Sequence, residues 1–237
     1  MHNCFGIYYV LAFYYYLESV MKKMHLLFAL FTLAVHCPAQ VAVSKEPRHH
    51  NVFENAFVRV LDVHIKPGDT SLFHKHETPS VFIVLNPVKT GSEVIVEEAK
   101  ATVFQKDAFI TFEGFYKSPR IHRVWNEDTA EFHVMDVEIL NKDPHDNNDS
   151  LLSPFQLLFN EKPVRTYRLN IDKDSTILLQ TKTPMLIVGL TDTQQMVRVN
   201  NTSFSKKGDF LFVPSGSPAE FTNKNKLHFS FAVLQFK

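Results

Sequence analysis

Short runs rich in Phe, Val, Ile and Leu recur along most of this chain, and Pro, Gly, Asn and Asp separate them. The runs at residues 57–65, 81–85 and 130–139 are rich in β-branched and aromatic residues, which favour strands over helices. Phe occurs 22 times and Gly only 7 times, so apolar side chains for a core are plentiful. Short strands at this spacing predict an all-β sandwich or small barrel.

Residues 21–40 have the pattern of a secretory signal peptide. Two lysines precede an apolar run at 26–35, and small residues follow it. We therefore expect translation to start at Met21 or Met24, the mature protein to lack residues 1–40, and its location to be periplasmic or secreted. A signal anchor built from both apolar stretches is the alternative, although charged residues interrupt a span of about 20 apolar residues.

Charge and cysteine content exclude several classes of function. Lys and Arg (25) balance Asp and Glu (25), which gives no electrostatic case for binding nucleic acid or an anionic membrane surface. Both cysteines, Cys4 and Cys37, precede the expected mature chain. Disulfides, thiol nucleophiles and cysteine-ligated metals are therefore excluded from the mature protein.

Similar short segments occur in the same order in the two halves of the expected mature chain. Their shared order predicts an internal duplication. The matched segments include Val58 with Val164, 81–85 with 186–190, and Phe132-His133 with Leu227-His228.

A polar, turn-rich stretch separates the two halves and suits a linker. We predict a first domain at 41–142, a linker at 143–153 and a second domain at 154–237.

Three histidines form the strongest candidate for chemistry. His74 and His76 lie two apart in an expected strand, so both side chains face the same side. A third, His122, comes from a distant strand, and two His from one strand plus one from another can bind a divalent metal. From spacing alone, solvated or packed histidines remain an equal alternative, because the chain has 12 His.

The residues around these histidines resemble the two motifs of the cupin superfamily. Gly68, five residues and His74-Lys75-His76 resemble the first motif, and Gly114, Pro119, His122 and Asn126 resemble the second. A weaker second-motif resemblance occurs at Gly208, Pro214, Gly216 and Asn223. The resemblance implies a bicupin, an all-β chain of two double-stranded β-helix (jelly-roll) barrels in tandem.

Carried over by motif, His74, His76 and His122 match the metal ligands of the superfamily. The motif glutamate is absent, since Ser80 and Val81 stand where it should fall, and Glu77 should point away from the histidines. The resemblance therefore implies one divalent metal, which is Fe, Zn, Mn, Ni or Cu, held by three His without a carboxylate.

The second copy has apolar or neutral residues at the ligand positions, namely Leu179, Thr181 and Ala219. We expect this second domain to be degenerate and to bind no metal. His133 has an apparent counterpart, His228, in that domain, which favours a structural role for His133. His49 and His50 follow the signal region and are interpreted as a flexible tail.

Four residues flank His122 and are candidates for binding a small-molecule substrate: Tyr116, Arg120, Arg123 and Trp125. The resemblance implies a metal-dependent dioxygenase or isomerase, with the catalytic residues unknown. The alternative is a non-catalytic ligand-binding or structural cupin. Because cupin barrels often pair, a homodimer also stays open.

Overall fold

The computed structural model describes residues 16–18, 20–23, 40–96, 109–145, 149–194 and 197–237. Residues 40–237 form one compact unit, and the preceding residues form another, of which the described part is helical. Among the described residues, no helix has the length and apolar character needed to cross a membrane. Most of the signal peptide expected at 21–40, namely residues 24–39, lies outside the described residues.

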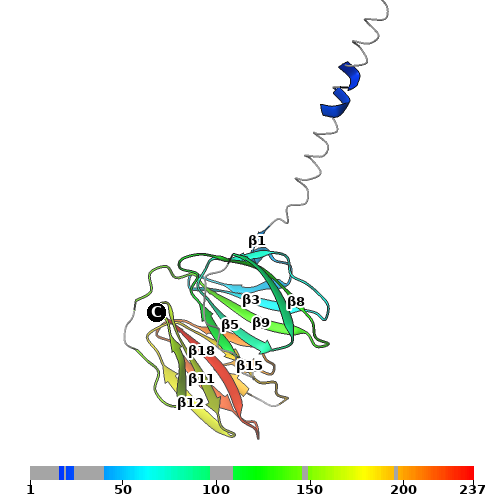
Figure 1. Cartoon of the computed structure of the whole chain (residues 1–237). Helices are drawn as coiled ribbons and strands as arrows, with labels where there is room; N and C mark the ends of the chain where they lie inside the picture. The colour runs from blue at the N-terminus through cyan, green and yellow to red at the C-terminus, as the bar shows by residue number, and fades with distance from the viewer. Residues whose placement is uncertain (1–15, 19, 24–39, 97–108, 146–148, 195–196) are drawn as a thin grey trace, which may run out of the picture. The chain divides into compact units, whose positions relative to one another are not determined.

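The first half of the compact unit contains two sheets and one 3-10 turn, η1 (Val43–Lys45) (Figure 1). The five-stranded sheet has, in spatial order, β2 (His49–Glu54), β3 (Val58–Ile65), β9 (Phe132–Ile139), β5 (Ser80–Asn86) and β7 (Ile110–Glu113). The four-stranded sheet has β1 (Val41–Ala42), β4 (His74–His76), β8 (Arg120–Asn126) and β6 (Thr90–Val96).

The second half also contains a five-stranded and a four-stranded sheet. The five-stranded sheet has, in spatial order, β10 (Phe155–Asn160), β11 (Val164–Ile171), β18 (Phe229–Phe236), β13 (Met185–Gly189) and β16 (Phe210–Val213). The four-stranded sheet has β12 (Ser175–Gln180), β17 (Pro218–Asn223), β14 (Val197–Val199) and β15 (Thr202–Phe204). The predicted all-β fold is therefore confirmed, while the domain boundaries within it stay a prediction.

The two five-stranded sheets have equivalent strand orders. An equivalent asparagine also makes the same hydrogen bonds in each half. Asn126 donates from Nδ2 to the carbonyls of Ile65 and Ala130, and Asn223 donates to those of Ile171 and Leu227. A buried amide that bonds two carbonyls fixes the chain direction where a strand ends. These equivalent asparagines, together with the register of the strand pairing, allow the two halves to be aligned residue by residue.

That register corrects one match made from the sequence. His64 pairs with His133 between β3 and β9, while Asn170 pairs with Ser230 between β11 and β18. The counterpart of His133 is therefore Ser230, and His228 lies outside the strand. The argument that His133 is structural because it is retained in the second half was wrong.

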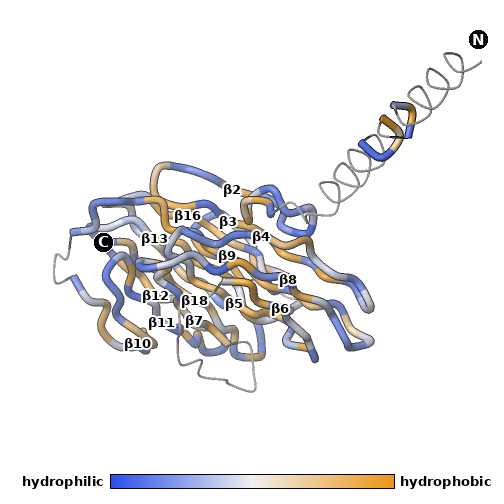
Figure 2. Tube along the Cα trace, turned by 45° about the horizontal axis from the view of Figure 1, so that its top comes forward, coloured by the Kyte–Doolittle hydropathy of each residue, from blue (hydrophilic) through white to orange (hydrophobic). Residues whose placement is uncertain are grey.

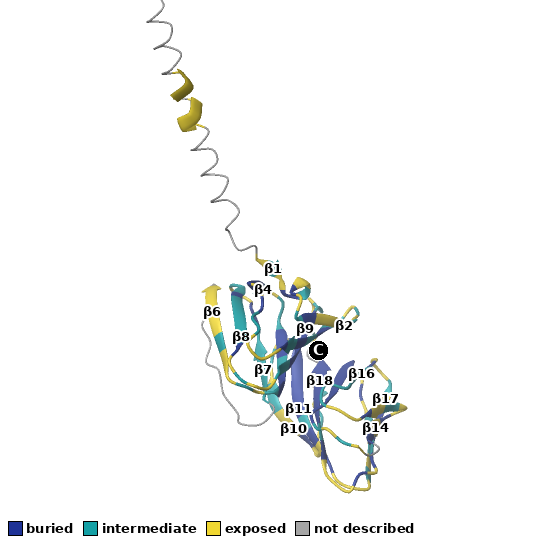
Figure 3. Ribbon diagram, turned by 90° about the vertical axis from the view of Figure 1, so that its right-hand side faces the viewer, coloured by how far each residue is buried: buried dark blue, intermediate teal, exposed yellow. Residues whose placement is uncertain are grey.

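One hydrophobic cluster joins the two halves. It combines residues of the first five-stranded sheet, such as Val60 and Val137, with residues of the second, such as Leu186 and Leu234. The five-stranded sheets thus pack face to face, and the four-stranded sheets lie outside them. Mostly buried strands, including β9, β11 and β18, run through the centre, and β6 is exposed at one edge (Figures 2 and 3).

The inside of the second half is filled by apolar side chains, among them a group of packed aromatic rings. Phe231 is fully buried, and its ring lies 4.7–5.4 Å from those of Phe204, Phe221 and Phe229, measured between centroids. Such edge-to-face and tilted packing stabilises a dry core. The inside of the first half holds a cavity instead, with histidines in its wall.

Candidate metal centre

Two paired strands bring the three predicted histidines together. In the antiparallel pairing of β4 with β8, His74 lies opposite His122 and His76 lies opposite Arg120. His76 Nε2 is 3.1 Å from His122 Nε2, and the ring centroids of His74 and His122 are 4.6 Å apart. Strand alternation and this register therefore direct all three imidazoles into the space between the sheets.

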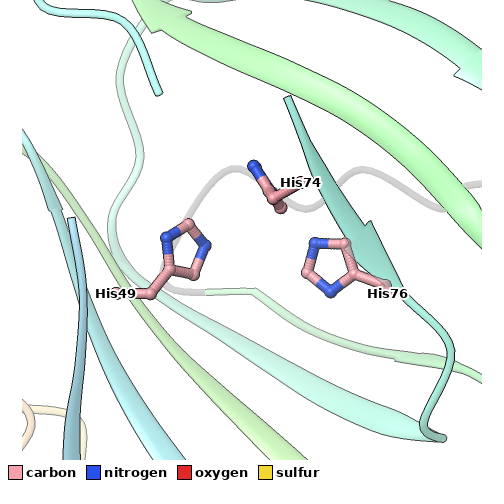
Figure 4. Close-up of side chains that lie close together, drawn as sticks. All are labelled: His49, His74 and His76. Carbon is pink, nitrogen blue, oxygen red and sulfur yellow. The ribbon is translucent and has the colours of Figure 1, made fainter. Parts of the chain in front are cut away.

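A fourth histidine, His49 at the start of β2, completes the cluster. One ring nitrogen of each of His49, His74 and His76 lies within 4.8 Å of the others, and their rings face a common point in Figure 4. The side chain of His49 is buried. The interpretation of His49 as part of a flexible tail was therefore wrong, because pairing of β2 with β3 places it on the sheet.

Hydrogen bonds hold two of these rings in a defined orientation. His49 Nδ1 lies 2.7 Å from Glu46 Oε2, and His74 Nδ1 lies 2.9 Å from the carbonyl oxygen of Leu72. A histidine that donates from Nδ1 keeps its lone pair on Nε2, the atom that can bind a metal. Glu46 and Leu72 thus fix which nitrogen of each ring points into the cavity.

The surroundings favour the neutral form of His74, His76 and His122. Burial, together with the nearby His49, lowers the pKa of His74 to about 4. Burial, together with the nearby His74 and Arg120, lowers the pKa of His122 to about 2. Burial, together with the nearby His122 and His74, places the pKa of His76 well below its ordinary value. Neutral imidazole is the form that binds a metal, so this cluster fits a divalent transition ion.

A carboxyl group lies in the cavity wall, although it does not come from the position of the missing motif glutamate. Asp136 of β9 is buried, and its Oδ2 is 3.5 Å from His76 Nδ1. Burial raises the pKa of Asp136 well above its ordinary value. A protonated Asp136 can donate a hydrogen bond to a ligand. At the motif position, the hydroxyl of buried Ser80 donates to the carbonyl oxygen of Thr78.

The cavity has a volume of about 310 Å³ and a mostly apolar wall. Phe82, Phe109 and Phe132 line it together with several Val and Ile side chains. The polar lining includes the histidines, Asp136, and Arg120, whose Nη1 donates to Glu113 Oε1 at 2.8 Å. The site therefore combines an apolar chamber with a polar end that includes the histidines and the Arg120–Glu113 ion pair.

The four residues predicted to bind substrate do not meet in one place. Arg120 lines the cavity with His122 and Val124, whereas Arg123 and Trp125 lie on the opposite side of β8, as alternate residues of a strand must. Arg123 pairs with Glu93, and Trp125 donates to Glu127. Tyr116 does not line the cavity either, and it is 57% exposed.

The second half carries no comparable cluster among the residues that the structure describes. Leu179 pairs with Ala219 between β12 and β17, just as His74 pairs with His122 between β4 and β8. Thr181 follows two residues after Leu179, in the place of His76. Ala219 is fully buried within the aromatic core of that half.

Glu46→Gln should weaken metal binding by about 10- to 100-fold, since a carboxylate that orients a ligating histidine also increases its basicity. The amide keeps the volume of this buried side chain but loses its charge. Competition with a chromogenic chelator measures the affinity. Glu54→Gln is the matched control, because Glu54 is exposed and pairs with Arg59. Equal affinities for the two variants would contradict the role of Glu46.

Searches of protein-family models and of curated proteins find no match to this chain. Solved structures share its fold. AerE from Microcystis aeruginosa is 11% identical, with a TM-score of 0.50 over 81% of this chain and 98% of that chain. YhhW from Escherichia coli is 12% identical, with a TM-score of 0.50 over 77% and 82%. Salicylate 1,2-dioxygenase from Pseudoaminobacter salicylatoxidans, with gentisate adducts, is 9% identical, with a TM-score of 0.52 over 90% and 79%.

Proposed function

Since the chain has the cupin fold and a buried cluster of histidines, we propose that it binds one divalent metal in the cavity of its first half and acts there on a small organic anion. The observation that carries the proposal is the group of His49, His74 and His76, whose ring nitrogens lie within 4.8 Å of one another, with His122 Nε2 3.1 Å from His76 Nε2 in the same cavity wall. His74, His76 and His122 are the ligands expected from the sequence, and His49 is the additional candidate.

Charge in the cavity favours an anionic ligand. Neutral histidines leave the full charge of a bound divalent ion uncompensated. Burial raises the pKa of Asp136 and so favours its neutral form, and Glu113 is paired with Arg120. A carboxylate or phenolate would therefore find one uncompensated positive partner, the ion, with the N–H groups of Arg120 and the carboxyl group of Asp136 beside it.

The apolar wall favours an aromatic or aliphatic body behind that anionic group. Phe82, Phe109 and Phe132 offer ring faces and edges, with which another ring packs well. The salicylate dioxygenase that shares this fold is recorded with gentisate, an aromatic acid. We therefore place a small aromatic acid first among the candidate substrates, and metal-dependent dioxygenation or isomerisation first among the reactions.

The residues of this chain would have separate tasks in such a reaction. A divalent ion, when bound, lowers the pKa of a coordinated hydroxyl or water and polarises its oxygen. Arg120 orients the carboxylate of the substrate, and Asp136 holds a proton within the chamber. The surrounding Phe and Val side chains exclude water, which strengthens the electrostatic contacts.

Metal analysis followed by oxygen uptake tests this function. The protein loaded separately with Fe²⁺, Mn²⁺, Ni²⁺, Cu²⁺ or Zn²⁺ is mixed with a panel of hydroxybenzoates. We expect oxygen consumption with at least one pair of metal and acid, and none with His76→Ala. Binding of an acid without turnover, for any metal, would favour the non-catalytic alternative. One observation favours that alternative, namely Ser80 at the position of the motif glutamate.

We also propose that the protein acts outside the cytoplasm, in the periplasm or as a secreted protein. The signal-like pattern at 21–40 supports this, and the compact unit begins at Gln40. Intact-mass measurement of the protein exported by its native host should find an N-terminus within a few residues of Gln40. A mature product that retains Met21 would contradict the proposal.

A further inference from the structure

A second group of metal-binding side chains lies on the opposite face of the same five-stranded sheet. Asp62 and His64 are two apart on β3, so they share a face, and His133 lies opposite His64 on β9. The neighbours of His133 on β9, Phe132 and Val134, face the cavity of the first site. His133 therefore points away from that cavity, toward the second half.

The three side chains are already close enough to share an ion. His133 Nε2 is 2.7 Å from Asp62 Oδ1, and His64 Nε2 is 3.2 Å from Asp62 Oδ2. The two imidazole rings stack with centroids 4.2 Å apart. One ligand atom of each residue lies within 4.8 Å of the others, and all three residues are partly exposed. Small side-chain rotations would bring these atoms around one ion.

The residues and the space around this group are those that a metal site needs. His64 Nδ1 lies 3.2 Å from Glu131 Oε2, so a carboxylate can orient this ring while Nε2 faces Asp62. A hollow of about 740 Å³ opens beside the group, and Asn86, Lys207 and Asp209 line it with Asp62 and His133. The hollow leaves room for water molecules to complete the coordination.

The second half of the chain forms part of this hollow. Gly208 has a φ of +86°, and a Cβ atom at that position would lie 3.2 Å from His133 Cε1. Lys207 Nζ donates to the carbonyl oxygen of Leu85 at 3.3 Å. The group thus lies at the junction of the two halves, where a bound ion would be partly shielded from solvent.

Nothing in the fold itself requires this group. The equivalent positions of the second half, identified by strand register, are Arg168, Asn170 and Ser230. There the Ser230 hydroxyl donates to Asn170 Oδ1 at 2.6 Å, and no acid or histidine is present. The same positions of the second sheet therefore hold Arg, Asn and Ser, so the fold does not require the Asp and two His that the first half has there.

We propose that Asp62, His64 and His133 form a second divalent metal site, separate from the cavity and exposed to solvent through the hollow. Two imidazoles and one carboxylate suit Zn²⁺, Ni²⁺ or Fe²⁺, with the remaining positions filled by water. The bound ion would take the place of the direct contacts that His64 and His133 each make with Asp62. Because only three protein groups bind it and the site is open, this ion exchanges more readily than the one in the cavity.

A Zn²⁺ titration of the full chain, by calorimetry and equilibrium dialysis, tests the second site. The unmodified protein should bind two equivalents, and His133→Ala and Asp62→Asn should each bind one. His76→Ala should also bind one, while the double variant His76→Ala/His133→Ala should bind none. Because Asp62→Asn preserves shape and His133 is partly exposed, both variants should keep the melting temperature of the metal-free protein within a few degrees.

His228→Ala is the matched control, because His228 forms an exposed pair with Asp172 without a third ligand. It should still bind two equivalents. The proposal is overturned if the unmodified protein binds a single equivalent that only His76→Ala removes. It is also overturned if His133→Ala and Asp62→Asn both retain two equivalents. Failure of His76→Ala alone to lose an equivalent would instead contradict the cavity site.

Discussion

Replacement of His76 by alanine should remove the metal bound in the cavity, with a loss of affinity greater than about 100-fold. His76 is central to the cluster, since its ring lies 4.9–6.4 Å from those of His49, His74 and His122, measured between centroids. Loss of a residue that only orients a ligand costs about 10- to 100-fold, and loss of a ligand itself should cost more. Competition with a chelator of known affinity measures the change.

Two measurements make this result interpretable. His228→Ala, at an exposed site far from the cluster in sequence, should leave the affinity unchanged. The melting temperature of metal-free His76→Ala should stay close to that of the parent protein, because the variant removes a polar group from an existing cavity. If His76→Ala folds and keeps its affinity, the cavity does not hold the metal.

Leu234→Ala should cost about 2–5 kcal/mol in the free energy of unfolding, the range for truncating a buried leucine. Leu234 is fully buried on β18, in the cluster that the two five-stranded sheets share. Because that cluster contains side chains from both halves, the loss should destabilise both together. Denaturant unfolding should show one transition, shifted to lower denaturant, by tryptophan fluorescence and by circular dichroism alike.

Trp125, the only tryptophan, makes this measurement specific. It lies in the first half, whereas Leu234 lies in the second. A shifted fluorescence transition would therefore show that the loss of stability in the second half also destabilises the first. Leu227→Ala is the control, since Leu227 is 70% exposed and its truncation should change stability by less than about 0.5 kcal/mol. An unshifted tryptophan signal in Leu234→Ala would mean that the halves unfold independently.

Local pattern was enough to predict much of this arrangement. The spacing of His74 and His76 depends only on strand alternation, and their convergence with His122 was predicted from the motif resemblance. The all-β class followed from short apolar runs between turn residues. Strand alternation and the all-β class are encoded within a few residues of where they act, whereas the convergence with His122 depends on the pairing of β4 with β8.

His49 could not be identified in the same way. Its burial depends on the pairing of β2 with β3 and on Glu46, three residues earlier, whose hydrogen bond orients the ring. Nothing in the polar sequence around His49 indicates a buried strand. The sequence does place an acid, Glu46, three residues before His49, but this spacing gains meaning only once the sheet is known.

The error at His133 had a different cause. Asn126 and Asn223 form equivalent hydrogen bonds, and the spacing from each asparagine to the next strand is the same in both halves. Aligning the halves on these asparagines places His133 opposite Ser230. The sequence match with His228 followed residue identity instead of spacing, and so it concealed a group of residues present in only one half.

The difference between the interiors of the two halves affects which substitutions such a chain can accumulate in evolution. One half keeps polar side chains buried around a chamber, which generally costs stability, while the other is packed with phenyl rings. The shared cluster lets the packed half support the other. The usual trade-off between activity and stability is thereby divided between two parts of one polypeptide, so stabilising substitutions can accumulate around Phe231 while the lining of the chamber remains free to acquire new specificities.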